Sequence, residues 1–195
     1  GRNFLLTHHG GYDVITIDPA PPLHSAGTVN LYTREFFDLC KAKLAPTGVV
    51  CMWLPPAPMT ESLMIMKTFV NAFPGATLWG GLSFSGFYLI GGHRPLDQTA
   101  ESLSALTGKL SSIEDLREWD AIYGDPKILR QLYLLDSKNF AILVENISEV
   151  TDNYPYTEFP MWRGVLTRNV PYIYSKSIRT YNETHAGQAL VPTMP

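Results

Sequence analysis

Cysteine is scarce in this chain: its 195 residues include two, Cys40 and Cys51. Two cysteines are too few for a disulfide-dense scaffold or a cysteine-based metal framework. They fit a reducing compartment, so we expect a cytoplasmic location. No hydrophobic run approaches the roughly 20 residues that a membrane-spanning helix needs, and no signal-peptide pattern opens the chain. We therefore expect these residues to be soluble as they stand.

An excess of charge of one sign is lacking as well. Fifteen Lys and Arg stand against eighteen Asp and Glu, which gives a net charge of −3. Without a basic run, a groove that binds nucleic acid through phosphate contacts is not expected. Hydrophobic residues make up 45% of the chain and charged residues 17%. Such a chain can bury enough apolar surface to fold, and its length suits one folding unit or a piece of one.

A glycine-rich nucleotide-binding loop is also missing. Gly10-Gly11 and Gly91-Gly92 are isolated pairs without the strand, loop and helix context of a G-x-G-x-x-G motif. The chain opens at Gly1 without an initiator Met and reaches its first clear strand by residue 12. We therefore expect it to be cut from a longer protein.

What the sequence does contain is an alternation of strand and helix patterns. The expected elements are a strand at Tyr12–Asp18, a helix at Leu31–Leu44, a strand at Val49–Leu54 and a helix at Thr60–Phe73. The β-branched or continuous apolar runs indicate the strands, and the 3.6-residue spacing indicates the helices. The second helix has a stripe that we assign to the core, formed by Leu63, Met66, Val70 and Phe73. This order predicts an α/β sheet that is parallel in its centre.

The pattern changes after these four elements. Ala76–Trp79 and Gly86–Ile90 predict two short strands that pair as an antiparallel edge of the same sheet. Helices are then expected at Ser112–Tyr123, Pro126–Leu135 and Asn139–Ile147, and the tail from Thr151 to Pro195 is expected to be mostly loop. We therefore divide the chain into an α/β part (1–95), a helical segment (96–150) and an irregular tail (151–195).

Asp18 is the first candidate for chemistry. It ends the first predicted strand, and ligands of open α/β sheets bind beyond the carboxyl ends of strands. The loop that follows is stiffened by Pro19, Pro21 and Pro22. A carboxylate at this place could bind or deprotonate an amine. The alternative is that Asp18 only satisfies loop amides, as a turn-forming residue does.

Several ordered segments resemble the polyamine aminopropyltransferases, the spermidine and spermine synthases. They are Gly1–Leu6 (GRNFLL), Tyr12–Asp18 (YDVITID), the proline-rich loop, and Leu31–Val50 (LYTREFFDLCKAKLAPTGVV). The likeness covers the first third of the chain and extends loosely to Gly91. It reappears at Thr151–Phe159 (TDNYPYTEF), which is similar to a stretch of bacterial spermidine-synthase-like proteins, including members fused to membrane-spanning segments.

The resemblance implies a fold, a reaction and roles for two residues. The fold would be the carboxyl-terminal part of a Rossmann-like, S-adenosylmethionine methyltransferase-type sheet with an added helical segment. The reaction would transfer an aminopropyl group from decarboxylated S-adenosylmethionine to an amine and release methylthioadenosine, with no tightly bound cofactor. Asp18 would accept the proton of the amine, and Gly1 would lie beside the donor. Because the half that carries the cofactor loop is absent, the chain alone is expected to be inactive. The likeness to membrane-fused members implies a parent protein that is tethered to the membrane through the missing amino-terminal part.

One departure from the family pattern leaves the function open. The family loop reads Asp-x-x-Asp-Pro, and here Pro21 takes the place of the second Asp. A partly buried ammonium ion needs a paired anion, so putrescine is a doubtful acceptor. A noncatalytic binding or regulatory domain with the same fold is the competing interpretation, and a methyltransferase-like enzyme is the third.

The other candidates are secondary. Asp152, Tyr154, Tyr156 and Glu158 are candidates to line an amine channel, because carboxylates and aromatic faces suit polyamines. His24 lies in the proline loop, and its alternative is an exposed loop histidine. His8 and His9 are expected to be solvated rather than metal-binding, and both cysteines to be inert.

The first predicted strand also suggests a partner. A strand cut off from its neighbours leaves backbone donors and acceptors unpaired. We expect self-association, or a second chain or segment that completes the sheet next to Tyr12–Asp18.

Overall fold

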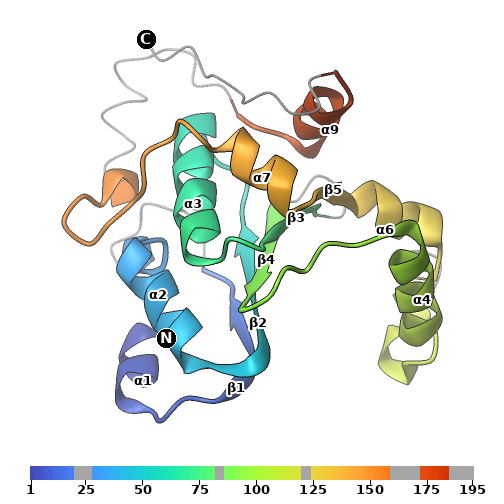
Figure 1. Ribbon diagram of the computed structural model, residues 1–195, viewed down its shortest axis with the longest axis horizontal. Helices are drawn as coiled ribbons and strands as arrows, with labels where there is room; N and C mark the ends of the chain where they lie inside the picture. Colours follow the sequence, from blue (N-terminus) through green and yellow to red (C-terminus); the bar gives the residue numbers. More distant parts are fainter. Residues whose placement is uncertain (20–27, 82–85, 120–123, 159–171, 185–195) are drawn as a thin grey trace.

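A mixed five-stranded sheet with helices packed against it forms the fold, as Figure 1 shows. This computed structural model describes residues 1–19, 28–81, 86–119, 124–158 and 172–184. The strands are β1 (Tyr12–Ile17), β2 (Leu44–Leu54), β3 (Thr77–Gly80), β4 (Phe87–Gly92) and β5 (Tyr133–Leu135). The α/β class that the sequence predicts is confirmed, and the sheet is consistent with a fragment of a Rossmann-like, methyltransferase-type fold.

The order of the strands is β1-β2-β4-β3-β5. β1 and β2 run parallel, whereas β4 runs antiparallel to both of its neighbours and β5 runs antiparallel to β3. The antiparallel pairing of the two short strands is therefore confirmed. Their place at an edge is wrong, because β4 pairs with β2 and β5 lies beyond β3. The predicted parallel centre is also wrong for the described strands.

The helices and helical turns have the following bounds: α1 (Arg2–Thr7), η1 (Val29–Leu31), α2 (Arg34–Lys43), α3 (Met59–Ala72), α4 (Ala100–Leu110), η3 (Glu114–Trp119), α6 (Pro126–Leu132), α7 (Ser137–Leu143), η4 (Tyr156–Glu158) and α9 (Ser175–Thr184). In Figure 1, α2, α3 and α7 lie along one side of the sheet, and α4 and α6 lie at the far end beyond β5.

The main core lies between the sheet and α2 and α3. Successive strand side chains point to opposite faces, and the buried positions alternate along β2 from Val50 to Met52 and Leu54. Phe69 of α3 is fully buried, with its ring centroid 5.2 Å from that of Phe37 and 4.8 Å from that of Phe73. The stripe predicted on α3 is confirmed as core, since its four residues are at most 6% exposed.

A glycine in β4 allows α3 to lie close to the sheet. A Cβ atom built on Gly91 would lie 2.7 Å from Cβ of Phe73. Real Cβ atoms do not come this close, so any larger residue would push α3 away from β4. The isolated glycine pair at 91–92 is therefore explained by packing rather than by phosphate binding.

The predicted elements after residue 96 need correction. The helix predicted at Pro126–Leu135 ends at Leu132, and its last three residues form β5. Of the helix predicted at Ser112–Tyr123, the structure describes only the 3₁₀ segment η3. α4 and α9 were not predicted. The helix predicted at Asn139–Ile147 begins two residues earlier and ends at Leu143.

Candidate active site at the end of β1

The sheet register brings Asp18 to one face of the sheet together with side chains of β2 and β4. Thr16 pairs with Cys51 and Ile17 with Met52, so Asp18 comes level with Trp53. On the other side of β2, Trp53 pairs directly with Tyr88. Because side chains alternate between faces, Asp18, Trp53 and Tyr88 lie on the face opposite the α2 and α3 core. Ile17 and Met52 belong to that core.

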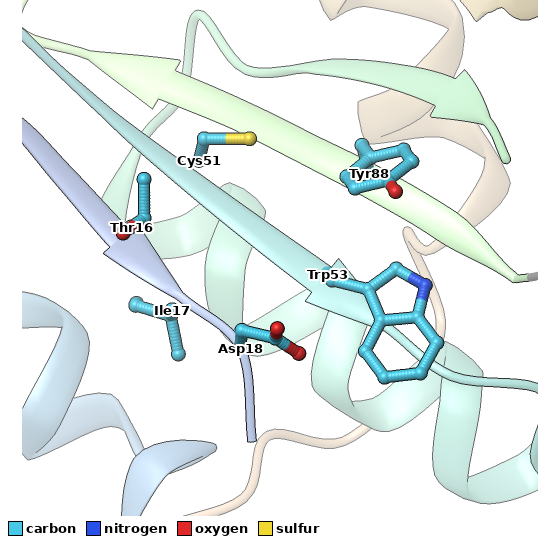
Figure 2. Close-up of a pocket in the computed structure, with 6 residues that line it drawn as sticks. All are labelled: Thr16, Ile17, Asp18, Cys51, Trp53 and Tyr88. Atoms are coloured by element: carbon cyan, nitrogen blue, oxygen red, sulfur yellow. The ribbon is translucent and has the colours of Figure 1, made fainter. Parts of the chain in front are cut away.

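A hollow of about 330 Å³ opens on this face, and we call it the Asp18 hollow. Six residues line it: Thr16, Ile17, Asp18, Cys51, Trp53 and Tyr88. Of these, Ile17 also belongs to the buried core. Figure 2 shows the carboxylate of Asp18 next to the indole ring of Trp53, with Tyr88 across from them on β4. Asp18 is exposed and Trp53 is half-buried. The hollow thus combines one solvent-accessible carboxylate with two aromatic side chains.

Tyr32 lies between η1 and α2 and is fully buried. Its hydroxyl makes no hydrogen bond with any residue in the described part of the chain. Burial raises the pKa of this phenol, and the negative charge of Asp18 raises it further. Tyr32 therefore stays protonated and neutral near Asp18 rather than adding a second negative charge.

The two cysteines differ in their access to the hollow. Cys40 is fully buried in the α2 core, and burial raises the pKa of its thiol to about 12. Burial also raises the pKa of Cys51, which is half-buried and lines the hollow. Because the thiolate is the nucleophile, both thiols are weak nucleophiles at neutral pH. Cys51, which lines the hollow, is the more accessible of the two thiols.

Gly1 and Asp152 lie close to the beginning of α2, in a different group of contacts. The Arg2 guanidinium binds Asp152 with both nitrogens, and its Nη1 lies 2.8 Å from Oδ1. The backbone N–H of Asp152 donates to Oε2 of Glu35 at 2.9 Å. A Cβ atom built on Gly1 would lie 3.8 Å from Leu31. Arg2 thus links Asp152 to the segment that begins at Gly1, and neither Gly1 nor Asp152 belongs to the lining of the Asp18 hollow.

The ion pair between Arg2 and Asp152 gives a pH-dependent prediction. Hydrogen bonding to Arg2 lowers the pKa of Asp152 below its usual 3.8, so the pair stabilises the fold above that value and loses its effect as the pH falls through the lowered pKa. Because about a third of the Asp152 side chain is exposed, we expect Asp152→Asn to cost less than about 1 kcal/mol at pH 7. Urea unfolding at pH 7 and at pH 3 measures this cost.

The control for that prediction is a double-mutant cycle with Arg2→Gln. At pH 7 the two substitutions together should cost no more than the larger single one. A cost of Asp152→Asn that is unchanged at pH 3, or strictly additive effects, would contradict the ion pair as the cause.

Tyr156 lies in another place again. With Tyr154 it lines a smaller apolar hollow of about 110 Å³ next to Leu63 and Met64 of α3. The rings of the two tyrosines are 6.0 Å apart. Pro21, His24 and the side chain of Glu158 lie outside the described residues. An amine channel that includes Tyr156 stays a prediction.

The described residues also bear on metal and membrane binding. Among them, no group of three or more His, Cys, Asp and Glu side chains is placed to hold a metal ion. His8 and His9 are exposed, and the ring of His8 stacks on Phe4 at 4.2 Å. Within the same ranges, no helix is both long and apolar enough to cross a bilayer.

Trp53 and Tyr88 line the site although neither was predicted to do so. Trp53 lies two residues after Cys51 on β2, so the strand period of two was a signal that both share one face. No comparable signal was available for Tyr88, because its contact with the hollow depends on β4 pairing with β2.

Comparison with known proteins gives a partial match. Over 59 residues the chain is 39% identical to a spermidine synthase of Dictyostelium discoideum. The match covers 28% of this chain and 20% of the length of that protein. No protein-family model matches the chain. The similarity to spermidine synthase is therefore local and weak, and it supports an aminopropyltransferase-like function at most.

Proposed function

We propose that this chain is part of an aminopropyltransferase that moves the aminopropyl group of decarboxylated S-adenosylmethionine to an amine. The position of Asp18 carries the proposal: it lies at the carboxyl end of β1 and opens into a hollow. This is the residue to which the resemblance gives the role of proton acceptor. The local identity with a spermidine synthase adds support from an independent comparison.

The proposed reaction is a displacement at carbon. The lone pair of the acceptor nitrogen attacks the methylene carbon bonded to the positively charged sulfur of the donor. A C–N bond forms and the C–S bond breaks, so sulfur leaves as the neutral thioether of methylthioadenosine. Because the amine arrives as an ammonium ion, the Asp18 carboxylate accepts one of its protons before the attack and passes it to water, which frees the lone pair on nitrogen. The product nitrogen keeps the other two protons and carries the positive charge as a secondary ammonium ion.

Asp18 and three residues outside the hollow have different proposed roles in these steps. The carboxylate of Asp18 attracts the protonated amine and orients its nitrogen. Gly1 remains our proposal for a residue beside the adenosyl group of the donor, and Asp152 and Tyr156 remain proposals for amine binding.

The test is an assay for methylthioadenosine, applied to the 195-residue chain and to the longest natural polypeptide that contains it. Decarboxylated S-adenosylmethionine is supplied with a panel of amines, and chromatography measures the product. We expect methylthioadenosine to form only when donor and amine are both present. If S-adenosylmethionine itself serves as the donor and gives S-adenosylhomocysteine, the enzyme is a methyltransferase. If neither product forms while the donor binds, a binding domain is indicated.

We also propose that the chain self-associates through the β1 side of the sheet. In the described part of the chain, β1 is an edge strand, and the side chain of Val14 is 58% exposed. Exposed, apolar edge strands pair readily with other chains. We expect light scattering to show oligomers for the native chain and a shift toward monomer for Val14→Lys.

The matched control is Leu6→Lys, because Leu6 is an apolar residue of similar exposure (59%) on α1. This variant should associate as the native chain does. A monodisperse monomer at high concentration, unchanged by Val14→Lys, would refute association through β1.

A further inference from the structure

Among the described residues that line it, the Asp18 hollow has one negatively charged side chain, where a diamine would require two. Of the six lining residues, only Asp18 carries a carboxylate. In the sequence, the next acidic residue after Asp18 is Glu35, and its Oε2 already accepts a hydrogen bond from the backbone of Asp152. A second ammonium group in the hollow would lose hydration without gaining an anionic partner.

The hollow supplies aromatic surface instead of that second charge. Trp53 and Tyr88 are direct partners across the β2–β4 ladder, and both line the hollow. Trp is the side chain that attracts a cation most strongly through its ring face, and Tyr does so as well. The same rings also bury apolar groups. In Figure 2 the Asp18 carboxylate lies next to the Trp53 ring. The ammonium group of an amine bound to Asp18 would therefore have an aromatic surface within reach.

The volume of the hollow, about 330 Å³, is at the small end of ligand sites. It suits a compact ligand that has a cationic end and an apolar end. We propose that the acceptor is a monoamine with an aromatic or branched apolar group, such as an arylalkylamine, rather than an α,ω-diamine. As a statement about the acceptor, this inference rests on the proposed transfer reaction, but the binding preference can be measured without a donor.

Cys51 gives a direct readout of the hollow. The chain has two cysteines, of which Cys51 lines the hollow and Cys40 is fully buried. A methanethiosulfonate reagent with a trimethylammonium group should label Cys51 in the folded chain, and mass spectrometry measures the rate. Three probes are added as competitors: phenethylamine, 1,4-diaminobutane, and phenethyl alcohol as the uncharged analogue.

We expect phenethylamine to protect Cys51 at concentrations at least about tenfold lower than 1,4-diaminobutane, and phenethyl alcohol to protect weakly. Asp18→Asn should remove most of the protection. Tyr88→Leu should weaken it by about 2- to 30-fold, whereas Tyr88→Phe, which keeps the ring, should change it little. Cys40 should remain unlabelled throughout, which shows that the chain stays folded. Calorimetric titration with the same three probes repeats the comparison independently of the thiol.

Equal or better protection by 1,4-diaminobutane in both measurements would overturn the inference, and so would equal protection by phenethyl alcohol. These outcomes are distinct from failure of the proposed function. A chain that prefers phenethylamine but releases no methylthioadenosine retains the binding preference and loses the transfer reaction. A chain that transfers the aminopropyl group most readily to diamines retains the transfer reaction and loses the inferred preference for monoamines.

Discussion

Replacing Asp18 by Asn is expected to lower the rate of methylthioadenosine formation by about 10²- to 10⁴-fold, which is the usual contribution of a positioned general base. Asn has nearly the same shape as Asp but neither accepts the proton of the amine nor attracts its positive charge. The effect should appear in kcat/KM for the amine, measured at saturating donor in the polypeptide that shows activity. The apparent affinity for the donor should change little, because Asp18 is proposed to contact the acceptor.

The matched control is Asp13→Asn. Asp13 is an exposed carboxylate on the same strand, but its side chain points to the other face of β1 and does not line the hollow. Its loss should leave kcat/KM within about twofold of the native value. A decrease below tenfold for Asp18→Asn, or equal decreases for the two variants, would contradict the role of Asp18 as proton acceptor.

Phe69→Ala is expected to destabilise the fold by about 3–5 kcal/mol. Phe69 is fully buried, and its ring contacts the aromatic rings of Phe37 and Phe73. Its loss leaves a cavity between α2 and α3 that close packing cannot fill without moving a helix. Urea unfolding gives the free energy, and for a chain of this size calorimetry should show Tm lower by about 6–20 °C.

Phe4→Ala provides the comparison for that loss. Phe4 is 52% exposed and contacts His8 by stacking, so the same change in side chain should cost less than about 1 kcal/mol. A cost of Phe69→Ala below about 2 kcal/mol would mean that α2 and α3 close the cavity by moving together.

Four strands and helices before residue 75 (β1, α2, β2 and α3) were predictable because their local pattern agrees with their packing, whereas α1 was not predicted. The apolar run of β2 is buried at alternate positions, and the stripe on α3 faces the sheet. The start of β2 was missed, because the sequence reads Pro46 and Gly48 as a helix stop, whereas the structure extends the strand back to Leu44. Proline and glycine occur both where a helix stops and where a strand begins, so the local sequence does not distinguish the two.

The later elements were harder to predict for a different reason. Tyr133–Leu135 continues the apolar spacing of α6, and only its pairing with β3 makes it a strand. α9 is mostly polar and buries Ile178 as its one core residue in the described part of the chain. Tertiary contacts determine the structure of such segments, and their sequences show little hydrophobic periodicity.

The site was predictable to the extent that it depends on one strand. Asp18 was identified from its place at the end of β1, and it does open into a hollow. The aromatic lining depends on three strands meeting in a particular order. That order places Tyr88 of β4 next to Trp53 of β2, although β3 separates the two strands along the chain.

The insertion of β4 between β2 and β3 has a consequence for the folding of the chain. β3 follows β2 along the chain, but among the described strands it pairs with β4 and β5 and not with β2. β3 and β4 form a local hairpin, of the kind that closes in about 1–10 μs. Among the described strands, this hairpin pairs with β2 through β4. β2 cannot form its hydrogen bonds with β4 until this hairpin docks. The pairing of Trp53 with Tyr88 therefore depends on a late, long-range folding step. The amides of β2, paired on both sides, should then open mainly when the whole sheet unfolds, whereas those on the outer side of β1 exchange without any such event.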